Sequence, residues 1–402
     1  MMSKQTKPAA QQIAKSRTLS KRQVIMYAVL AVAVVGGPLY FQSIGNAFLV
    51  HICALIGIYV LLSLGLNIVV GYAGLLDLGY IAFYGMGAYV GVLLGLVFQH
   101  LVGGPNSALA GYSYWILLIP AALAGAMTGL ALGTPVLRLR GDYLAIVTLG
   151  FGEIVRIALQ NNFLGLTNGA AGLPRVGEVI VPAAGQKWVY LHLSTATFTF
   201  SKDLFWYFVI VLLCLLAIFV IRRLDNSRLG RAWVAMREDE VAAAASGINI
   251  MKTKLWAFSL GAMWGGIAGI TYAYWIGFIS PESFNFMESV LVVCMVVLGG
   301  MGSIPGVILG ATIIAGLPEI IRYLAQSPLL SNVLTAQQAT AVGNYRYLLF
   351  GGMMVVMMAL RPQGIIPSTR RAHELTNVPS VIEEENEALW EAEHKSETPR
   401  SL

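Results

Sequence analysis

Six ionisable side chains lie within or beside long apolar stretches, where they could take part in chemistry. They are Asp77, Glu153, Arg156, Glu282, Glu288 and Glu319. A charged group is costly in apolar surroundings, so such residues mark candidate functional sites. Glu153 and Arg156 are three positions apart on one helical face, which predicts either an internal ion pair or a contact to a substrate. Asp77 stands beside a break in an apolar stretch, where it could serve function or cap the following helix.

The most informative polar segment covers residues 228–249. Acidic residues stand at 238–240, an alanine run follows at 242–245, and Gly247 comes after it. Acidic side chains favour the first turn of a helix, alanine favours its interior and glycine favours its end. The segment therefore predicts one short helix, whose surface is either simply solvated or available to a partner.

Sequence motifs for enzyme chemistry, nucleotide binding and metal binding are absent. The chain has no GxxxxGK[ST] motif and not even a Gly-Lys pair, so it cannot hold ATP through that device. It has no HExxH motif, and its five histidines are scattered. The three cysteines lie in separate apolar stretches and predict packing residues. We therefore expect no catalytic residue, no metal site and no bound cofactor, with energy supplied by another chain or by an ion gradient.

The elements that must position these residues are membrane helices. The sequence of 402 residues is 57% hydrophobic and 11% charged, whereas soluble domains carry about 25% charged residues. A bilayer core of about 30 Å needs roughly 20 apolar residues for each crossing. We therefore expect an all-α polytopic membrane protein with about eight to ten transmembrane helices, and membrane lipid rather than nucleic acid as its surroundings.

Ten apolar runs predict the individual helices. Their ranges are 24–41, 47–70, 80–98, 114–136, 143–160, 204–221, 255–277, 287–300, 306–322 and 345–360. Most of the 26 lysines and arginines lie before the first helix, at 138–140, at 222–254 and from 361 onward. Basic residues concentrate in cytoplasmic loops, so we expect both termini in the cytoplasm.

Three regions follow from this topology. They are a basic cytoplasmic segment (1–23), a transmembrane domain (24–361) and an acidic cytoplasmic tail (362–402). Inside the transmembrane domain, residues 161–203 form an external loop, either a small cap or short strands, and residues 222–254 form a cytoplasmic loop. The acidic tail has the composition of a solvated extension, and neither it nor the external loop predicts a second globular domain.

Glycine predicts how the helices pack and where they break. Three sets recur at four-residue spacing: Gly87, Gly91, Gly95; Gly261, Gly265, Gly269; and Gly302, Gly306, Gly310. Small residues on one face let helices approach closely in lipid, and such faces could also slide or gate. Two glycine-rich stretches, 71–79 and 299–306, interrupt apolar runs and predict broken helices, which are tolerated beside a cavity or within protein.

Several motifs, in order and spacing, resemble the LivM-type permease family of branched-chain amino-acid ABC importers. They are Leu66–Gly74, Gly85–Tyr89, Arg140–Gly150, Thr167–Gly169 with Gly172–Leu173, Glu240–Gly247 and Gly299–Ser303. The resemblance extends from about residue 47 to Arg361–Gly364. Within this resemblance, the segment Glu240–Gly247 is similar to the loop with which ABC importer permeases contact their ATPases.

The resemblance implies a multi-pass subunit of the bacterial inner membrane that works by alternating access. It implies as partners a second, LivH-type permease, two ABC ATPase subunits and a periplasmic substrate-binding protein, with ATP and Mg bound by the ATPases. The implied ATPase-coupling residues are Arg237, Glu238, Asp239, Glu240, Ala243 and Gly247. The implied pathway or gating residues are Asn67, Gly71, Gly74, Asp77, Glu153, Asn168, Gly300, Gly302 and Ser303.

Two alternatives remain open from the sequence. Permeases of this type also serve urea and short amides, and their selectivity resides largely in the binding protein. A secondary transporter working alone would instead use Asp77 or Glu153 as an ion or proton site. The chain also departs from the family pattern, because Val307 stands where such permeases often have proline after Gly306, so the local kink could differ.

Overall fold

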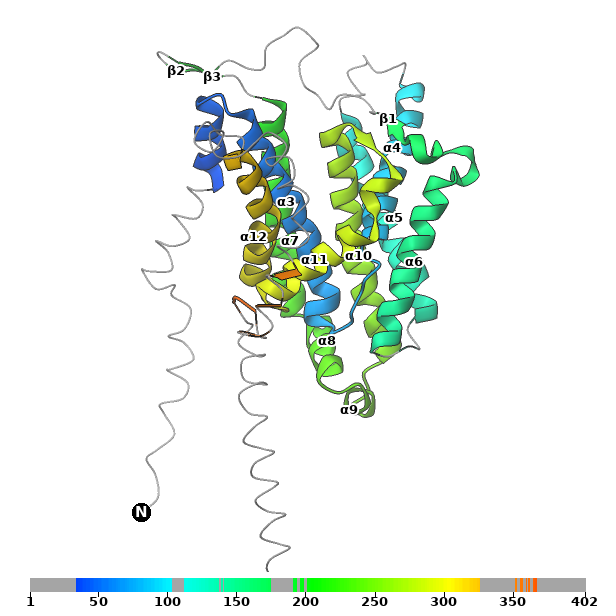
Figure 1. Ribbon diagram of the computed structural model, residues 1–402. Coiled ribbons are helices and arrows are strands. Elements are labelled where there is room, and N and C mark those ends of the chain that lie inside the picture. Colours follow the sequence, from blue (N-terminus) through cyan, green and yellow to red (C-terminus); the bar gives the residue numbers. More distant parts are fainter. Residues whose placement is uncertain are drawn as a thin grey trace, which may run out of the picture.

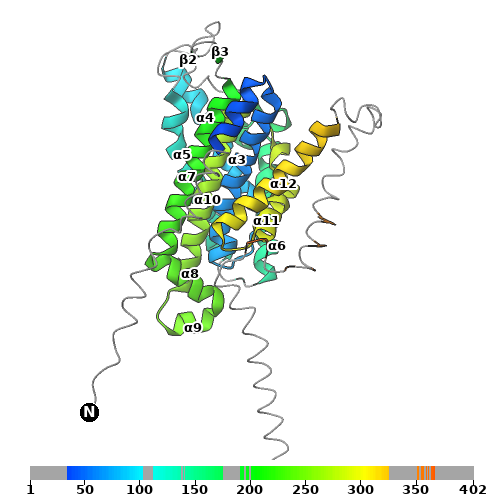
Figure 2. The same ribbon diagram turned by 90° about the vertical axis from the view of Figure 1, so that its left-hand side faces the viewer.

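The protein is an elongated helical bundle (Figures 1 and 2). The computed structural model describes residues 34–102, 112–136, 139, 141–174, 191–193, 196–198, 201–325, 351–352, 355–356, 359, 361 and 364–366. Within these residues, seven helices are long and apolar enough to cross a membrane, which confirms a polytopic helical membrane protein. The predicted helices 24–41 and 345–360 lie largely outside the described residues, as do segment 1–23 and most of the acidic tail. The count of ten and the cytoplasmic placement of both termini therefore stay predictions.

The long helices follow the predicted apolar runs closely. They are α3 (Ala47–Asn67), α4 (Ile81–Leu101), α5 (Ser113–Val136), α6 (Asp142–Gln160), α7 (Lys202–Asp225), α10 (Ile250–Ile276), α11 (Phe286–Gly299) and α12 (Ile304–Ala325). Local signals set their ends. The Ser201 hydroxyl accepts from the Leu204 N–H at 3.3 Å to begin α7, and the Asn285 side chain accepts from the Glu288 N–H at 3.1 Å to begin α11.

Helix α10 is the centre of the bundle and packs against α5, α4 and α3 (Figure 1). It is not among the seven apolar spans, since glycine and aromatic residues lower its hydropathy, yet most of it is buried. A Cβ atom added to Gly87 would strike the Gly266 backbone, and one added to Gly269 would strike the Tyr84 carbonyl. The glycines therefore allow close backbone approach between α4 and α10, as their spacing predicts.

Both predicted helix breaks are present. Helix α3 continues into a π-helical turn, η2 (Ile68–Tyr72), after which residues 73–80 run without helix to α4. The second break, Gly300–Ser303, separates α11 from α12, with Gly300 at φ 117° and Gly302 at φ 80°. Because α12 begins only at Ile304, Gly302 belongs to the break and not to the glycine stripe of the helix, which corrects the predicted stripe.

The segment 161–203, predicted to be external, forms short turns and strands where it is described. Two 3₁₀ turns, η4 (Phe163–Gly165) and η5 (Gly169–Ala171), follow α6. Strand β1 (Leu173–Pro174) then pairs antiparallel with β4 (Phe278–Ile279), which follows α10, and β2 (Leu191–Leu193) pairs with β3 (Ala196–Phe198). The pairing of β1 with β4 fixes this segment beside the 3₁₀ turn η6 (Pro281–Phe284) that leads into α11.

Candidate functional site

The polar segment 228–249 folds into two helices at one end of the bundle, α8 (Arg228–Glu238) and α9 (Glu240–Ala245) (Figures 1 and 2). The single predicted helix is therefore wrong in detail. Asp239 is extended and ends α8, while its Oδ1 atom accepts from the N–H groups of Val241 and Ala242 at 2.7 and 3.0 Å, which caps α9. Gly247, at φ 84°, follows α9 in the left-handed conformation that glycine favours.

Two buried contacts fasten these short helices to α10. The Trp233 indole N–H donates to the Thr253 carbonyl at 2.9 Å, and this tryptophan is almost fully buried. The Lys254 ammonium is 2.5 Å from Glu240 Oε1, with only 4% of the Lys254 side chain exposed. Both short helices are therefore attached to the start of α10.

A third contact connects α8 to the first helix break. Arg237 Nη1 donates to the Gly71 carbonyl in η2 at 2.7 Å. The side chain also crosses Gly74, whose φ is 70°, and a Cβ atom there would lie 2.6 Å from Arg237 Cγ. The end of the helix at η2 leaves the Gly71 carbonyl available to an outside donor, and the absence of a side chain at position 74 lets Arg237 reach it.

The first break in turn contacts the second. Asn67 is fully buried at the end of α3, and its Oδ1 atom accepts from the Gly302 N–H at 2.9 Å. A Cβ atom on Gly71 would strike this amide and would lie 2.6 Å from the Gly302 nitrogen. We call Arg237, Gly71, Asn67 and Gly302 the junction. It joins α8 to both helix breaks through two hydrogen bonds.

Ser303 and Gly300 shape the second break without joining the junction. The Ser303 hydroxyl accepts from the Gly306 N–H at 3.3 Å and caps α12. The positive φ of Gly300 turns the chain out of α11. Beside this turn, the Ile365 and Ile366 N–H groups donate to the carbonyls of Leu298 and Gly299 at 2.9 and 3.1 Å. Residues 364–366 therefore lie against the end of α11, beside the break.

Asp77 lies in the connection between η2 and α4, outside the spanning helices. It is fully buried, and its Oδ1 atom accepts from the Gly79 N–H at 2.9 Å. Burial raises the pKa of the Asp77 carboxyl to about 7, although the hydrogen bonds from Gly79 and Thr148 oppose this shift. Thr148 also accepts from the Leu78 N–H at 3.0 Å. The carboxyl thus holds the connection against α6.

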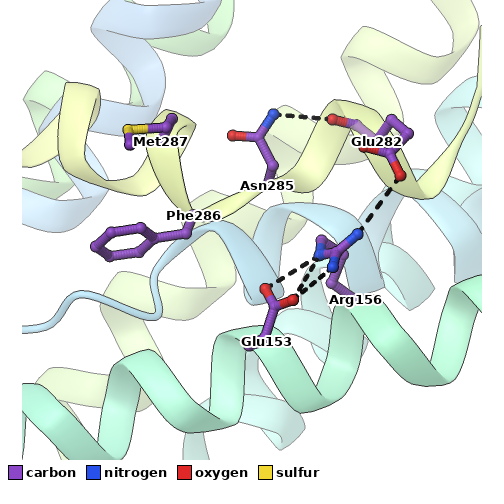
Figure 3. A pocket seen from close by; sticks show the side chains of 6 residues that line it. All are labelled: Glu153, Arg156, Glu282, Asn285, Phe286 and Met287. Carbon is purple, nitrogen blue, oxygen red and sulfur yellow. Dashed lines mark hydrogen bonds and ion pairs between the residues drawn. The ribbon is translucent and has the colours of Figure 1, made fainter.

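Glu153 and Arg156 form the ion pair that their spacing predicts, and a third residue joins them (Figure 3). Arg156 Nε donates to both Glu153 oxygens at 3.0 Å, and Arg156 Nη1 lies 3.5 Å from Glu282 Oε1. These three residues lie with Asn285, Phe286 and Met287 around an open pocket of about 330 Å³. The predicted site residue Asn168 stands apart from it in a turn, where it donates to the Gly172 carbonyl at 2.8 Å.

Residues 48–358 match the family described as branched-chain amino acid transport system / permease component. The chain belongs to this family. It is 41% identical over 368 residues, 89% of this chain and 78% of the relative, to the high-affinity branched-chain amino acid transport system permease protein LivM of Escherichia coli (strain K12). The LivM-type resemblance of the motifs is therefore confirmed.

More distant permeases also match. LivH of Escherichia coli (strain K12), the high-affinity branched-chain amino acid transport system permease protein of that name, is 26% identical over 313 residues, 77% of this chain and 91% of the relative. The fructose import permease protein FrcC of Rhizobium meliloti is 24% identical over 344 residues, covering 84% and 83%. No solved structure matches the chain. The similarity to permeases named for different solutes thus extends over most of this chain and of the relatives.

The sequence analysis names all four residues of the junction but misses residues that fasten the surrounding elements. Trp233, Thr148 and Lys254 hold the site together, and nothing in their spacing marks them. A buried polar atom is the signal that identifies such residues in a structure. The Asn67 amide nitrogen, for example, is buried without a hydrogen-bond partner among the described residues. In the same part of the chain, no group of three or more histidine, cysteine and acidic residues could hold a metal ion.

Proposed function

We propose that this chain is the LivM-type transmembrane subunit of an ATP-driven, binding-protein-dependent importer of branched-chain amino acids in the bacterial inner membrane. The family match and the LivM relatives support this assignment. Its partners are a LivH-type permease, two ABC ATPases that bind ATP and Mg, and a periplasmic substrate-binding protein. The likeness of this same chain to LivH supports a pair of related permeases.

The observation that carries the mechanism is the hydrogen bond from Arg237 to the Gly71 carbonyl. In our proposal, the ATPases contact the exposed face of α9 and the adjoining residues Glu238, Asp239 and Gly247. Within α9, Glu240 holds Lys254 and Ala243 is buried against the protein. When the ATPases close on ATP, α9 moves, and α8 moves with it. Arg237 transmits that motion to η2, and Asn67 transmits it to Gly302. The two helix breaks therefore shift together, which opens the pathway to one side of the membrane.

Uptake of labelled leucine tests this proposal. Cells lacking the chain are compared with the same cells carrying it, each with and without the neighbouring ATPases. We expect leucine uptake only where the chain and the ATPases are both present. Uptake of urea but not leucine would keep the architecture and refute the substrate. If leucine enters without the ATPases and an uncoupler abolishes this uptake, the ABC mechanism is refuted and the secondary transporter is favoured.

A further inference from the structure

The pocket between α6 and the start of α11 carries three charged side chains, those of Glu153, Arg156 and Glu282. Glu153 and Arg156 lie within a span of membrane-crossing composition, and 37% of the Glu153 side chain is exposed. Charged residues within membrane segments face protein or a water-filled cavity. This face of α6 therefore borders either the second permease or the aqueous pathway, and an open pocket of about 330 Å³ fits the pathway, because small-molecule sites measure roughly 300–1,000 Å³.

The charges of the pocket match the two ends of an amino acid. Glu153 is held firmly by Arg156, whereas Glu282 is 68% exposed and contacts Arg156 only at 3.5 Å. An arginine has five N–H donors, and Nε, Nη1 and Nη2 of Arg156 already donate to Glu153, Gln160 and Glu282. Among the described residues, one Nη2–H remains without an acceptor, and the bond to Glu282 at 3.5 Å is long enough to be exchanged. A carboxylate can therefore accept from both Nη atoms while Glu282 accepts from an ammonium group.

The remaining wall of the pocket is suited to an apolar side chain. Phe286 and Met287 line the pocket on the α11 side, separated from Glu282 by Asn285 (Figure 3), and Met287 is 52% exposed. The Asn285 side chain already donates to the Glu282 carbonyl at 3.0 Å and accepts from the Glu288 N–H at 3.1 Å. It therefore fixes the turn and leaves recognition to its neighbours.

We propose that Arg156, Glu282, Phe286 and Met287 form a transit site for the zwitterion of an α-amino acid with an apolar side chain. Arg156 binds the carboxylate, Glu282 binds the ammonium group, and Phe286 and Met287 contact the side chain. Glu153 is a positioning residue that orients Arg156. The site rests on the proposed function, because it acts on the solute that the binding protein delivers.

Leucine transport per ATP hydrolysed tests the site. The complete importer is reconstituted in proteoliposomes with saturating leucine-loaded binding protein, and the chain carries Arg156→Gln, Arg156→Lys or Glu282→Gln. Helix α12 offers a matched control, because Glu319 and Arg322 form an ion pair with the same i, i+3 spacing at 2.6 Å. The control variant is Arg322→Gln.

We expect Arg156→Gln to lower leucine transported per ATP by about tenfold or more, because hydrogen bonds to charged groups contribute about 1.5–3 kcal/mol. Arg156→Lys restores part of the loss, and ATP hydrolysis stimulated by the binding protein persists. If Arg156→Gln prevents assembly of the importer, leucine transport per ATP in Glu282→Gln tests the site instead. The Glu282 side chain is exposed, so folding should not depend on it. The site is overturned if Glu282→Gln transports as much leucine per ATP as the wild type. It is also overturned if Arg322→Gln loses as much transport as Arg156→Gln. Both results leave the importer assignment intact. Absence of leucine transport by the wild-type complex overturns both.

Discussion

Replacing Arg237 with alanine should separate ATP hydrolysis from transport. The variant removes the bond from Nη1 to the Gly71 carbonyl, a 2.7 Å contact between α8 and the first helix break. It leaves in place the cap of α9 by Asp239 and the attachment of α8 through Trp233. The surface proposed for the ATPases therefore persists, while its connection to η2 is lost.

The size of the effect follows from the type of bond. A hydrogen bond from a charged donor contributes about 1.5–3 kcal/mol, and each 1.4 kcal/mol is a factor of ten. If the whole of this energy couples the ATPases to the breaks, leucine transported per ATP should fall by about 10- to 100-fold in Arg237→Ala. Arg237→Lys keeps a donor of nearly the same reach and should retain intermediate coupling.

The assay measures leucine uptake and ATP hydrolysis in the same proteoliposomes. Arg231→Ala is the matched control, because Arg231 lies on the same helix and only donates to the nearby Asn226 carbonyl at 3.2 Å. Co-purification of the ATPases shows that the complex is assembled. An Arg237→Ala complex that assembles and moves as much leucine per ATP as the Arg231→Ala complex would refute the junction as the coupling route.

Three further predictions concern the same region. Gly71→Ala should lower the free energy of unfolding by about 1–3 kcal/mol, because the added methyl group overpacks against Asn67 and Gly302. The Tm in detergent should fall accordingly, whereas the Tm of Gly150→Ala should not, because a Cβ atom there meets open space. Equal Tm values for the two variants would contradict the packing. Gly247→Trp should reduce co-purification of the ATPases without loss of membrane insertion, and unchanged co-purification would contradict the docking role. Burial raises the Asp77 pKa to about 7. The wild type should therefore lose stability as pH rises from about 4 to 7, because the carboxyl ionises in the unfolded chain while the folded protein keeps it protonated. Asp77→Asn should lack this loss, and parallel pH profiles of stability for the two proteins would contradict it.

The sequence predicts the helices well, because apolar length and capping residues are local signals. It places α7 within a few residues, since Ser201 and the basic pair at 222–223 mark its ends. The division of the polar segment 228–249 at Asp239 is harder to predict, because aspartate favours the start of a helix but does not show that another helix ends there.

The junction itself could not be predicted from spacing. Its residues are separated by 166 and 235 positions along the chain, and only tertiary packing brings them together. The sequence predicts breaks at the glycines 71 and 302. The structure shows why position 71 is glycine: the Asn67 amide occupies the space that a side chain would need. The third member of the charged pocket, Glu282, likewise reaches Arg156 because β4 pairs with β1 and directs η6 toward α6.

The π-helical turn η2 also limits the kinds of motion that α3 can make. Changing it to an α-helical turn would take up one residue, which corresponds to about 1.5 Å of rise and a rotation of about 100°. Such a change would turn Asn67 away from Gly302. The π-helical form of η2 is therefore part of the arrangement in which a hydrogen bond joins the two breaks.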